Sequence, residues 1–100
     1  MTRFELTPGA SQDLDEIEAY IAQDSPDAAR RVILELQTAM QRLAEFPNLG
    51  HRRPDVDDPR YRFWVVFSYL IVYIPDTDPL QIIRVVHAYR DLPAMLKPAP

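Results

Sequence analysis

The chain carries two helix-start signals close together, and this pair restricts the fold more than any other feature of the sequence. Thr7-Pro8 and Ser25-Pro26 each place a hydroxyl side chain before a proline. The hydroxyl can cap a helix, and proline at the first helical position has no amide hydrogen to leave unpaired. After each signal, apolar residues recur at the spacing of one helix face. The sequence therefore predicts two amphipathic helices, whose short connection makes them an antiparallel hairpin.

The other apolar runs are rich in β-branched and aromatic residues, which favour strands. RFEL precedes the first helix. Three runs follow the second helix, with only short spacers between one run and the next: RYRFWVVF, YLIVYI and LQIIRVVHAY. Short spacers favour an antiparallel meander, because a parallel pair needs a long crossover. We expect an α+β fold with the order β-α-α-β-β-β, in which the helical hairpin packs on one face of a small antiparallel sheet. A chain of 100 residues has room for one domain, and its expected parts are a strand (1–7), two helices (8–24 and 26–46), a loop (47–59), a three-stranded meander (60–90) and a tail (91–100).

The run YLIVYI is apolar on both of its faces. Alternation puts its tyrosines and Ile71 on one face, and Leu70, Val72 and Ile74 on the other. Helices on one side of the sheet can cover only one of these faces. We therefore expect something else to cover the second face.

The amino-acid composition excludes several classes of functional site. The chain has no cysteine, so disulfides, thiolate catalysis and thiolate metal ligands are excluded. It has two glycines, Gly9 and Gly50, which excludes a glycine-rich loop for phosphates or a dinucleotide cofactor. His51 and His87 are its two imidazoles and the carboxylates are scattered, so we expect neither a metal nor a cofactor. The apolar runs are too short to cross a bilayer and the amino-terminal residues do not resemble a secretory signal, so we expect a cytoplasmic protein without a membrane partner.

Arginines gather in the proline-containing segment after the second predicted helix. Arginine is well suited to bidentate contacts with carboxylates or phosphates. Aspartates stand among these arginines, however, so we interpret the segment as a locally neutralised surface loop. The formal net charge of −4 also argues against broad nucleic-acid binding, and we expect no direct sequence-specific binding of DNA by this chain. The arginines are Arg52, Arg53, Arg60 and Arg62, and the aspartates are Asp55, Asp57 and Asp58.

The last strand-like stretch, IIRVVHAYRDL, ends in side chains that suit acid–base chemistry. On a phosphodiester, His87 and Tyr89 would transfer protons. An arginine, either Arg62, Arg84 or Arg90, would stabilise the developing negative charge. Strand alternation places the two proton carriers on one face and Arg84 and Arg90 on the other, which divides the group. The alternative is a part-buried histidine and a core tyrosine at a strand end, and it stays open beside the catalytic hypothesis.

Five pieces of the sequence match a known family in their order and spacing. They are ASQDLDEIEAYIA, SPDAARRVILEL, RLAEFPNLGHRRP, YLIVYI and IIRVVHAYRDL. Together they resemble the RelE/ParE superfamily of toxins from type II toxin–antitoxin systems, and they are most similar to its ParE branch. The resemblance covers nearly the whole chain. It implies a helical hairpin against a small antiparallel sheet, the fold expected above.

The resemblance also implies a function. ParE-like toxins of bacteria act on DNA gyrase, which leads to stalled cleavage complexes and blocked replication. A cognate ParD-like antitoxin neutralises them with a carboxy-terminal segment that wraps the toxin, which would cover surface that the toxin leaves open. A binding surface then does the work, and no residue is expected to be catalytic. By motif position, the candidate target-binding residues are Arg62, Arg90, Arg52 and Arg53.

RelE-like relatives imply an alternative function. They cleave messenger RNA in the ribosomal A site, with a basic residue in the middle strand and arginine, tyrosine or histidine near the carboxy terminus. Here the middle-strand position is Leu70 and the one lysine of the chain is Lys97, which disfavours a nuclease. If the chain is a nuclease, His87, Tyr89 and Arg90 would be its catalytic residues. A third alternative is an inactive toxin homologue that only binds its antitoxin.

The turn between the first two strands of the meander departs from the family pattern. Phe67-Ser68 stands where the family commonly has a glycine. Glycine supplies the positive φ that a tight hairpin needs. We therefore expect a wider hairpin at this turn.

Overall fold

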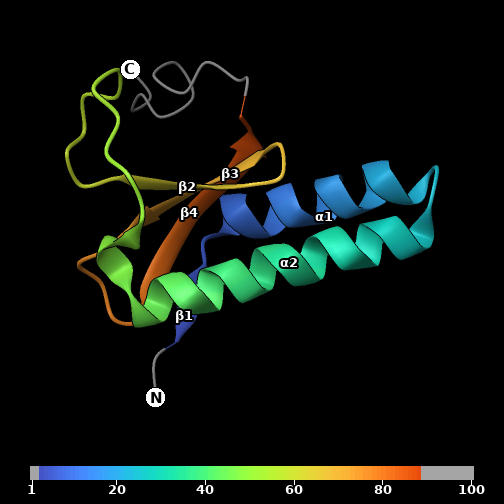
Figure 1. Ribbon diagram of the computed structural model, residues 1–100, viewed down its shortest axis with the longest axis horizontal. Helices are drawn as coiled ribbons and strands as arrows, with labels where there is room; N and C mark the ends of the chain where they lie inside the picture. The colour runs from blue at the N-terminus through green and yellow to red at the C-terminus, as the bar shows by residue number, and fades with distance from the viewer. Residues whose placement is uncertain (1–2, 89–100) are drawn as a thin grey trace.

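The structure, a computed structural model, describes residues 3–88 of the 100-residue chain. Its elements follow the order predicted from the sequence, with a short 3-10 helix added after the second α-helix. Figure 1 shows the two α-helices as an antiparallel hairpin whose connecting turn projects beyond the sheet. The elements are β1 (Phe4–Leu6), α1 (Pro8–Ala22), α2 (Pro26–Glu45), η1 (Pro47–Leu49), β2 (Arg62–Val66), β3 (Tyr69–Ile74) and β4 (Leu80–His87).

Both helix-start signals form caps. The side-chain oxygen of Thr7 accepts a hydrogen bond from the N–H of Ala10 at 3.1 Å. The side-chain oxygen of Ser25 accepts one from the N–H of Ala28 at 3.2 Å. α2 ends just before Pro47, which cannot continue a helix. The limits of the helical hairpin are therefore set by local signals.

The four strands form one sheet in the order β1-β4-β3-β2. β2, β3 and β4 form the expected antiparallel meander. β1 pairs with β4 in parallel, with Phe4 opposite Leu80 and Leu6 opposite Ile82. The sheet is therefore mixed, and the expectation of a wholly antiparallel sheet is corrected at this edge. Parallel pairing is possible here because both helices and two strands intervene, which exceeds the crossover length that it requires.

The β2–β3 hairpin is tight. Val66 lies opposite Tyr69, so Phe67 and Ser68 alone connect the two strands. Phe67 has a φ of 55°, in the left-handed region that favours glycine and is unusual for an aromatic residue. The expectation of a wider hairpin is therefore wrong, because the cross-strand packing sets the register and the backbone of Phe67 adapts to it.

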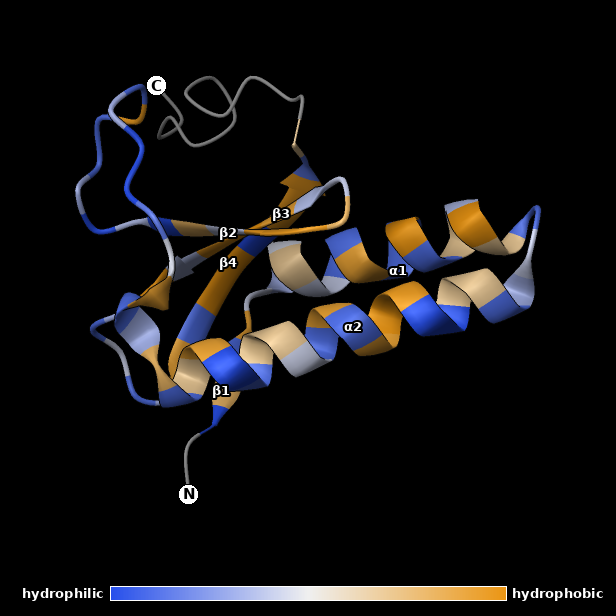
Figure 2. Ribbon diagram, viewed as in Figure 1, coloured by the Kyte–Doolittle hydropathy of each residue, from blue (hydrophilic) through white to orange (hydrophobic). Residues whose placement is uncertain are grey.

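Apolar side chains fill both faces of the sheet. The main core lies between the sheet and the helices, where Leu36 and Met40 of α2 pack with Ile71 of β3. The apolar colouring runs along β3 and much of β4 (Figure 2). On the opposite face, Val56 packs on residues of all three meander strands, so the segment between η1 and β2 covers surface that the helices leave open. This second cluster consists of Val56, Phe63, Leu70, Val72 and Val86.

Residues 3–88 contain neither a cluster of metal ligands nor a membrane-spanning helix. No three histidine, aspartate or glutamate side chains gather there as ligands for a metal ion. Neither helix of this part of the chain combines the length and the apolar character that crossing a bilayer requires.

Candidate functional site

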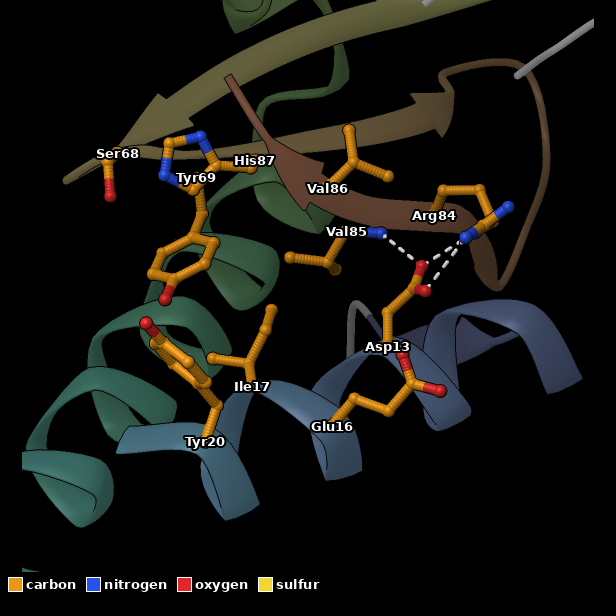
Figure 3. A pocket seen from close by; sticks show the side chains of 10 residues that line it. All are labelled: Asp13, Glu16, Ile17, Tyr20, Ser68, Tyr69, Arg84, Val85, Val86 and His87. Carbon is orange, nitrogen blue, oxygen red and sulfur yellow. Dashed lines mark hydrogen bonds and ion pairs between the residues drawn. The ribbon is translucent and has the colours of Figure 1, made fainter. Parts of the chain in front are cut away.

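A hollow of about 480 Å³ lies between α1 and the adjoining ends of β3 and β4. Figure 3 shows the hydroxyl groups of Tyr20 and Tyr69 directed toward each other on one side of it, with Ile17 and Val85 in its middle. Such a hollow, with apolar surface and a few convergent polar groups, is typical of a binding site. Its lining residues are Asp13, Glu16, Ile17, Tyr20, Ser68, Tyr69, Arg84, Val85, Val86 and His87.

An ion pair closes the side of the hollow opposite the two tyrosines (Figure 3). Asp13 is buried and accepts hydrogen bonds from Nε of Arg84 at 2.6 Å and from Nη2 at 2.9 Å. It accepts a third from the backbone N–H of Val85 at 2.9 Å. The hydrogen bonds to Asp13 raise the pKa of Arg84 above its usual value, and the nearby carboxylate of Glu16 adds to this effect. The hydrogen bonds of Asp13 to Arg84 and Val85 tie α1 to β4.

The position of Asp13 follows from the shortness of β1. β1 ends at Leu6, so the edge of β4 beyond this point has no neighbouring strand. Backbone groups at such an edge need other partners when they are buried. Thr7 donates its hydroxyl to the carbonyl of Ile83 at 2.7 Å, and Asp13 takes the N–H of Val85 at 2.9 Å. The start of α1 thus supplies partners for two backbone groups of the strand edge.

His87 ends β4 at the rim of the hollow. Its ring contacts that of Tyr69 edge to face, with 5.8 Å between the ring centroids. Alternation predicted His87 and Arg84 on opposite faces, yet both line the hollow, because the long side chain of Arg84 reaches Asp13 at the strand edge. The other members of the hypothetical catalytic group, Tyr89 and Arg90, lie outside the described residues.

Leu70 occupies the middle strand, where RelE-like nucleases would have a basic residue. It is 3% exposed and lies opposite Val86 in the second apolar cluster. This position therefore belongs to the core of the chain and does not face the hollow.

Arg62, a candidate for target binding, contacts the backbone of its own chain. Its Nη1 donates to the carbonyl of Gly50 at 2.9 Å and to that of Asn48 at 3.5 Å. The buried Tyr73 hydroxyl donates to the carbonyl of Pro47 at 2.6 Å and accepts from the N–H of Gly50 at 2.9 Å. Burial raises the pKa of Tyr73. Arg62 and Tyr73 together hold the segment after α2 against the sheet.

The other arginines after α2 are largely neutralised, as the sequence predicted. Arg53 forms two hydrogen bonds with Asp55, at 3.0 and 2.8 Å, and Arg60 pairs with Asp58 at 2.6 Å. The hydrogen bonds from these arginines lower the pKa of both aspartates. Arg52 differs, because it is exposed and donates to a carbonyl oxygen, that of Pro59, at 2.8 Å. The remaining target-binding candidate, Arg90, lies outside the described residues.

Asp13 and Arg84 were not recognised as a pair from the sequence. Both interrupt apolar patterns, since Asp13 follows Ala10 at the spacing of the buried face of α1 and Arg84 divides the run IIRVV. Two opposite charges that interrupt apolar patterns in this way could have signalled that they meet, because unpaired charges are rarely buried.

Three comparisons place the chain among known proteins. A family model described as the ParE toxin of the type II toxin–antitoxin system parDE matches residues 4–92. The protein Y4kP of Sinorhizobium fredii, named as a candidate toxin, is 38% identical over 94 residues, which cover 94% of this chain and 96% of that protein. Toxin RelE2 of Caulobacter vibrioides is 38% identical over 81 residues, which cover 81% of this chain and 89% of that protein.

A solved structure has the same fold. It is described as a chromosomal ParDE TA system from P. aeruginosa, and it matches with a TM-score of 0.70 at 22% identity, covering 87% of this chain and 96% of that chain. The resemblance inferred from the sequence motifs is confirmed by the family model, which spans nearly all of the chain. The chain belongs to the ParE toxin family of type II toxin–antitoxin systems.

Proposed function

We propose that this ParE-family toxin inhibits DNA gyrase by binding it, without a catalytic step of its own, and that a ParD-like antitoxin neutralises it. The observation that carries the proposal is the burial of Leu70 in the second apolar cluster. A buried leucine cannot contact a phosphate or move a proton. The middle strand therefore lacks the basic group that the RelE-like mechanism uses, and this favours the binding activity of the ParE branch.

The exposed Arg52 is the foremost candidate for contact with the target. Its guanidinium donates to one carbonyl oxygen and keeps its charge at the surface. Arg53 is held by Asp55, and Arg62 is held by carbonyls of its own chain. Both are therefore secondary candidates, together with Arg90.

The hollow beside α1 is the proposed docking site of the antitoxin. It combines apolar surface at Ile17 and at the rings of Tyr20 and Tyr69 with exposed polar groups at its rim. Tyr20 is 73% exposed, which is high for an aromatic residue next to apolar surface. Amphipathic peptide segments, which carry both polar and apolar side chains, bind to surfaces of this kind.

A ribosome-dependent messenger-RNA endonuclease is the second candidate function. The 38% identity to toxin RelE2 favours it, as does the exposed position of His87 at the rim of the hollow. In this case His87 would act with Tyr89 and Arg90.

Two assays in parallel test the proposal. The purified chain is added to gyrase with plasmid DNA, and separately to programmed ribosomes with messenger RNA. We expect inhibited supercoiling or trapped cleavage complexes, and intact message. Cleavage of message in the A site with normal gyrase activity would refute the proposal in favour of the nuclease. Inactivity in both assays, with tight antitoxin binding, would identify an inactive homologue.

Two variants sharpen these assays. Arg52→Ala should weaken gyrase inhibition, whereas His87→Ala should leave it unchanged if no proton transfer occurs. Loss of growth arrest in a folded His87→Ala variant that still binds the antitoxin would point to catalysis.

A further inference from the structure

The wall of the hollow formed by α1 has surplus negative charge. α1 contains four acidic residues and no basic one. Two of the four, Asp13 and Glu16, line the hollow, and Arg84 is the arginine that lines it with them. Arg84 is paired with Asp13 through two hydrogen bonds, so its charge offsets that of Asp13. The surplus negative charge is therefore that of the exposed Glu16.

Acceptor groups and aromatic rings line the side of the hollow across from this charge (Figure 3). The hydroxyl groups of Tyr20, Ser68 and Tyr69 belong to the lining. Hydroxyl and carboxylate oxygens accept hydrogen bonds from ammonium or guanidinium groups, and aromatic faces attract cations. The half-buried Ile17 provides apolar surface between these groups (Figure 3). Long basic side chains suit such a surface, because their methylene stems pack on apolar groups while their charge stays near water.

We propose that the hollow binds the side chain of an arginine or lysine from the antitoxin, with its charge beside Glu16 and its stem against Ile17. This inference rests on the docking site proposed above. A carboxylate in the same place would be repelled by Glu16, and an apolar side chain would take polar groups of the rim from water without pairing them. The net charge of −4 on the whole chain adds attraction for a basic segment.

The direct test uses the full chain and N-acetyl-arginine amide as a probe. N-acetyl-citrulline amide, which has nearly the same shape and no charge, is the matched ligand. Both are titrated while NMR spectroscopy follows the backbone amides. We expect the arginine compound to shift the amides of Ile17, Ser68 and Val85 and to bind at least about threefold more tightly than the citrulline compound. Equal binding of the two compounds, or shifts confined to other parts of the chain, would overturn the proposal.

Two variants separate the site from a general attraction to acidic α1. Glu16→Gln should weaken binding of the arginine compound about threefold to fivefold and leave the citrulline compound unaffected. Glu18→Gln removes the same charge from α1, but Glu18 does not line the hollow, so binding should be unchanged. Both side chains are exposed, so both variants should fold. Equal losses in the two variants would overturn the site.

A competition experiment tests the occupant. The antitoxin, taken as the product of the adjoining reading frame, should displace the arginine compound. If the antitoxin binds and the compound stays bound, the antitoxin does not occupy the hollow and the proposed occupant is wrong, although neutralisation stands. If the antitoxin does not bind the chain, the proposed function fails together with the occupant. Glu16-dependent binding of the arginine compound, measured without antitoxin, still decides whether the hollow is a cation site.

Discussion

Asp13 of α1 and Arg84 of β4 are joined by two hydrogen bonds of 2.6 and 2.9 Å. The side chain of Asp13 is 9% exposed, whereas that of Arg84 is 33% exposed. The third hydrogen bond to this carboxylate, from the N–H of Val85, fixes it to the strand backbone. Asp13 thus acts both as an ion-pair partner and as the acceptor for a free strand edge, and it shapes one side of the hollow.

Asp13→Asn should lower the free energy of unfolding by about 2 kcal/mol, because the amide loses the charge-assisted hydrogen bonds to Arg84. The partial exposure of Arg84 keeps this loss below the roughly 3–5 kcal/mol of a fully buried pair. Urea denaturation measures the change. Asp15→Asn, on the exposed face of α1, is the control and should differ from wild type by less than about 0.5 kcal/mol. Equal stability of the two variants would contradict this role of Asp13.

Gly50→Ala should lower the free energy of unfolding more than Gly9→Ala does. A Cβ atom at Gly50 would lie 2.5 Å from Oη of Tyr73 and 3.0 Å from the carbonyl oxygen of Phe63, both of which are held by hydrogen bonds. We expect a loss of about 2–3 kcal/mol from this overpacking. A Cβ atom at Gly9 would lie 3.1 Å from Cδ of Arg84, in a side chain that can shift, and alanine favours the helix. Its effect should stay below about 1 kcal/mol, and the reverse order in urea denaturation would contradict the packing at Gly50.

The helices were predictable because their limits depend on neighbouring residues. Thr7 and Ser25 cap the helices that they precede, whatever the rest of the chain does. The parallel pairing of β1 was not predictable in the same way, since three residues carry no signal for their partner. The tight turn at Phe67 contradicts the local preference for glycine, because the packing of β2 on β3 decides the register.

In the candidate site, too, contacts between residues close in the sequence could be predicted, whereas contacts between distant residues could not. Neutralisation of Arg53 by Asp55 could be predicted, because the two residues are close in the sequence. The pairing of Asp13 with Arg84 could not, because it joins the first helix to the last strand. Arg62 appeared to be a surface residue available to a target, and only the path of the segment after α2 brings carbonyl groups to its guanidinium.

The fold should lose stability at alkaline pH because the phenol of Tyr73 is buried. Burial raises the pKa of its phenol above the ordinary value of 10.0, and the hydrogen bond from the Gly50 N–H and the charge of Arg62 offset this only in part. The folded chain therefore holds the proton more tightly than the unfolded chain does. Its contribution to stability is complete below about pH 10 and is lost as the pH rises through the folded pKa.

Urea denaturation between about pH 8 and pH 11 checks this expectation. The free energy of unfolding of the wild type should fall more steeply with pH than that of Tyr73→Phe, which has no phenol to ionise. Tyr20→Phe, at an exposed position, is the control and should keep the steep fall. Parallel curves for the wild type and Tyr73→Phe would contradict the raised pKa.

Substitutions of Arg52 and Arg62 should have different effects on stability and on gyrase inhibition. Arg62→Ala removes hydrogen bonds to the carbonyls of Gly50 and Asn48 and should lower the free energy of unfolding by about 1–2 kcal/mol. Arg52→Ala should change stability by less than about 0.5 kcal/mol and weaken gyrase inhibition. Urea denaturation and the supercoiling assay together measure both effects. Unchanged inhibition by a folded Arg52→Ala variant would remove Arg52 from the target-binding surface.

Phe67→Asn should stabilise the fold, although it removes an aromatic residue. Asparagine tolerates a φ of 55° better than phenylalanine does, and the ring of Phe67 is 60% exposed, so little burial is lost. We expect a gain of up to about 1 kcal/mol in the free energy of unfolding.

Phe46→Asn is the matched control for this substitution. Phe46 is 58% exposed, close to the value for Phe67, but it has a φ of −130°. It should therefore show the loss of the ring without the relief of backbone strain, and its stability should be unchanged or lower. If urea denaturation finds Phe67→Asn destabilised as much as Phe46→Asn, the strain at the hairpin is smaller than its φ indicates, and the ring itself stabilises the turn.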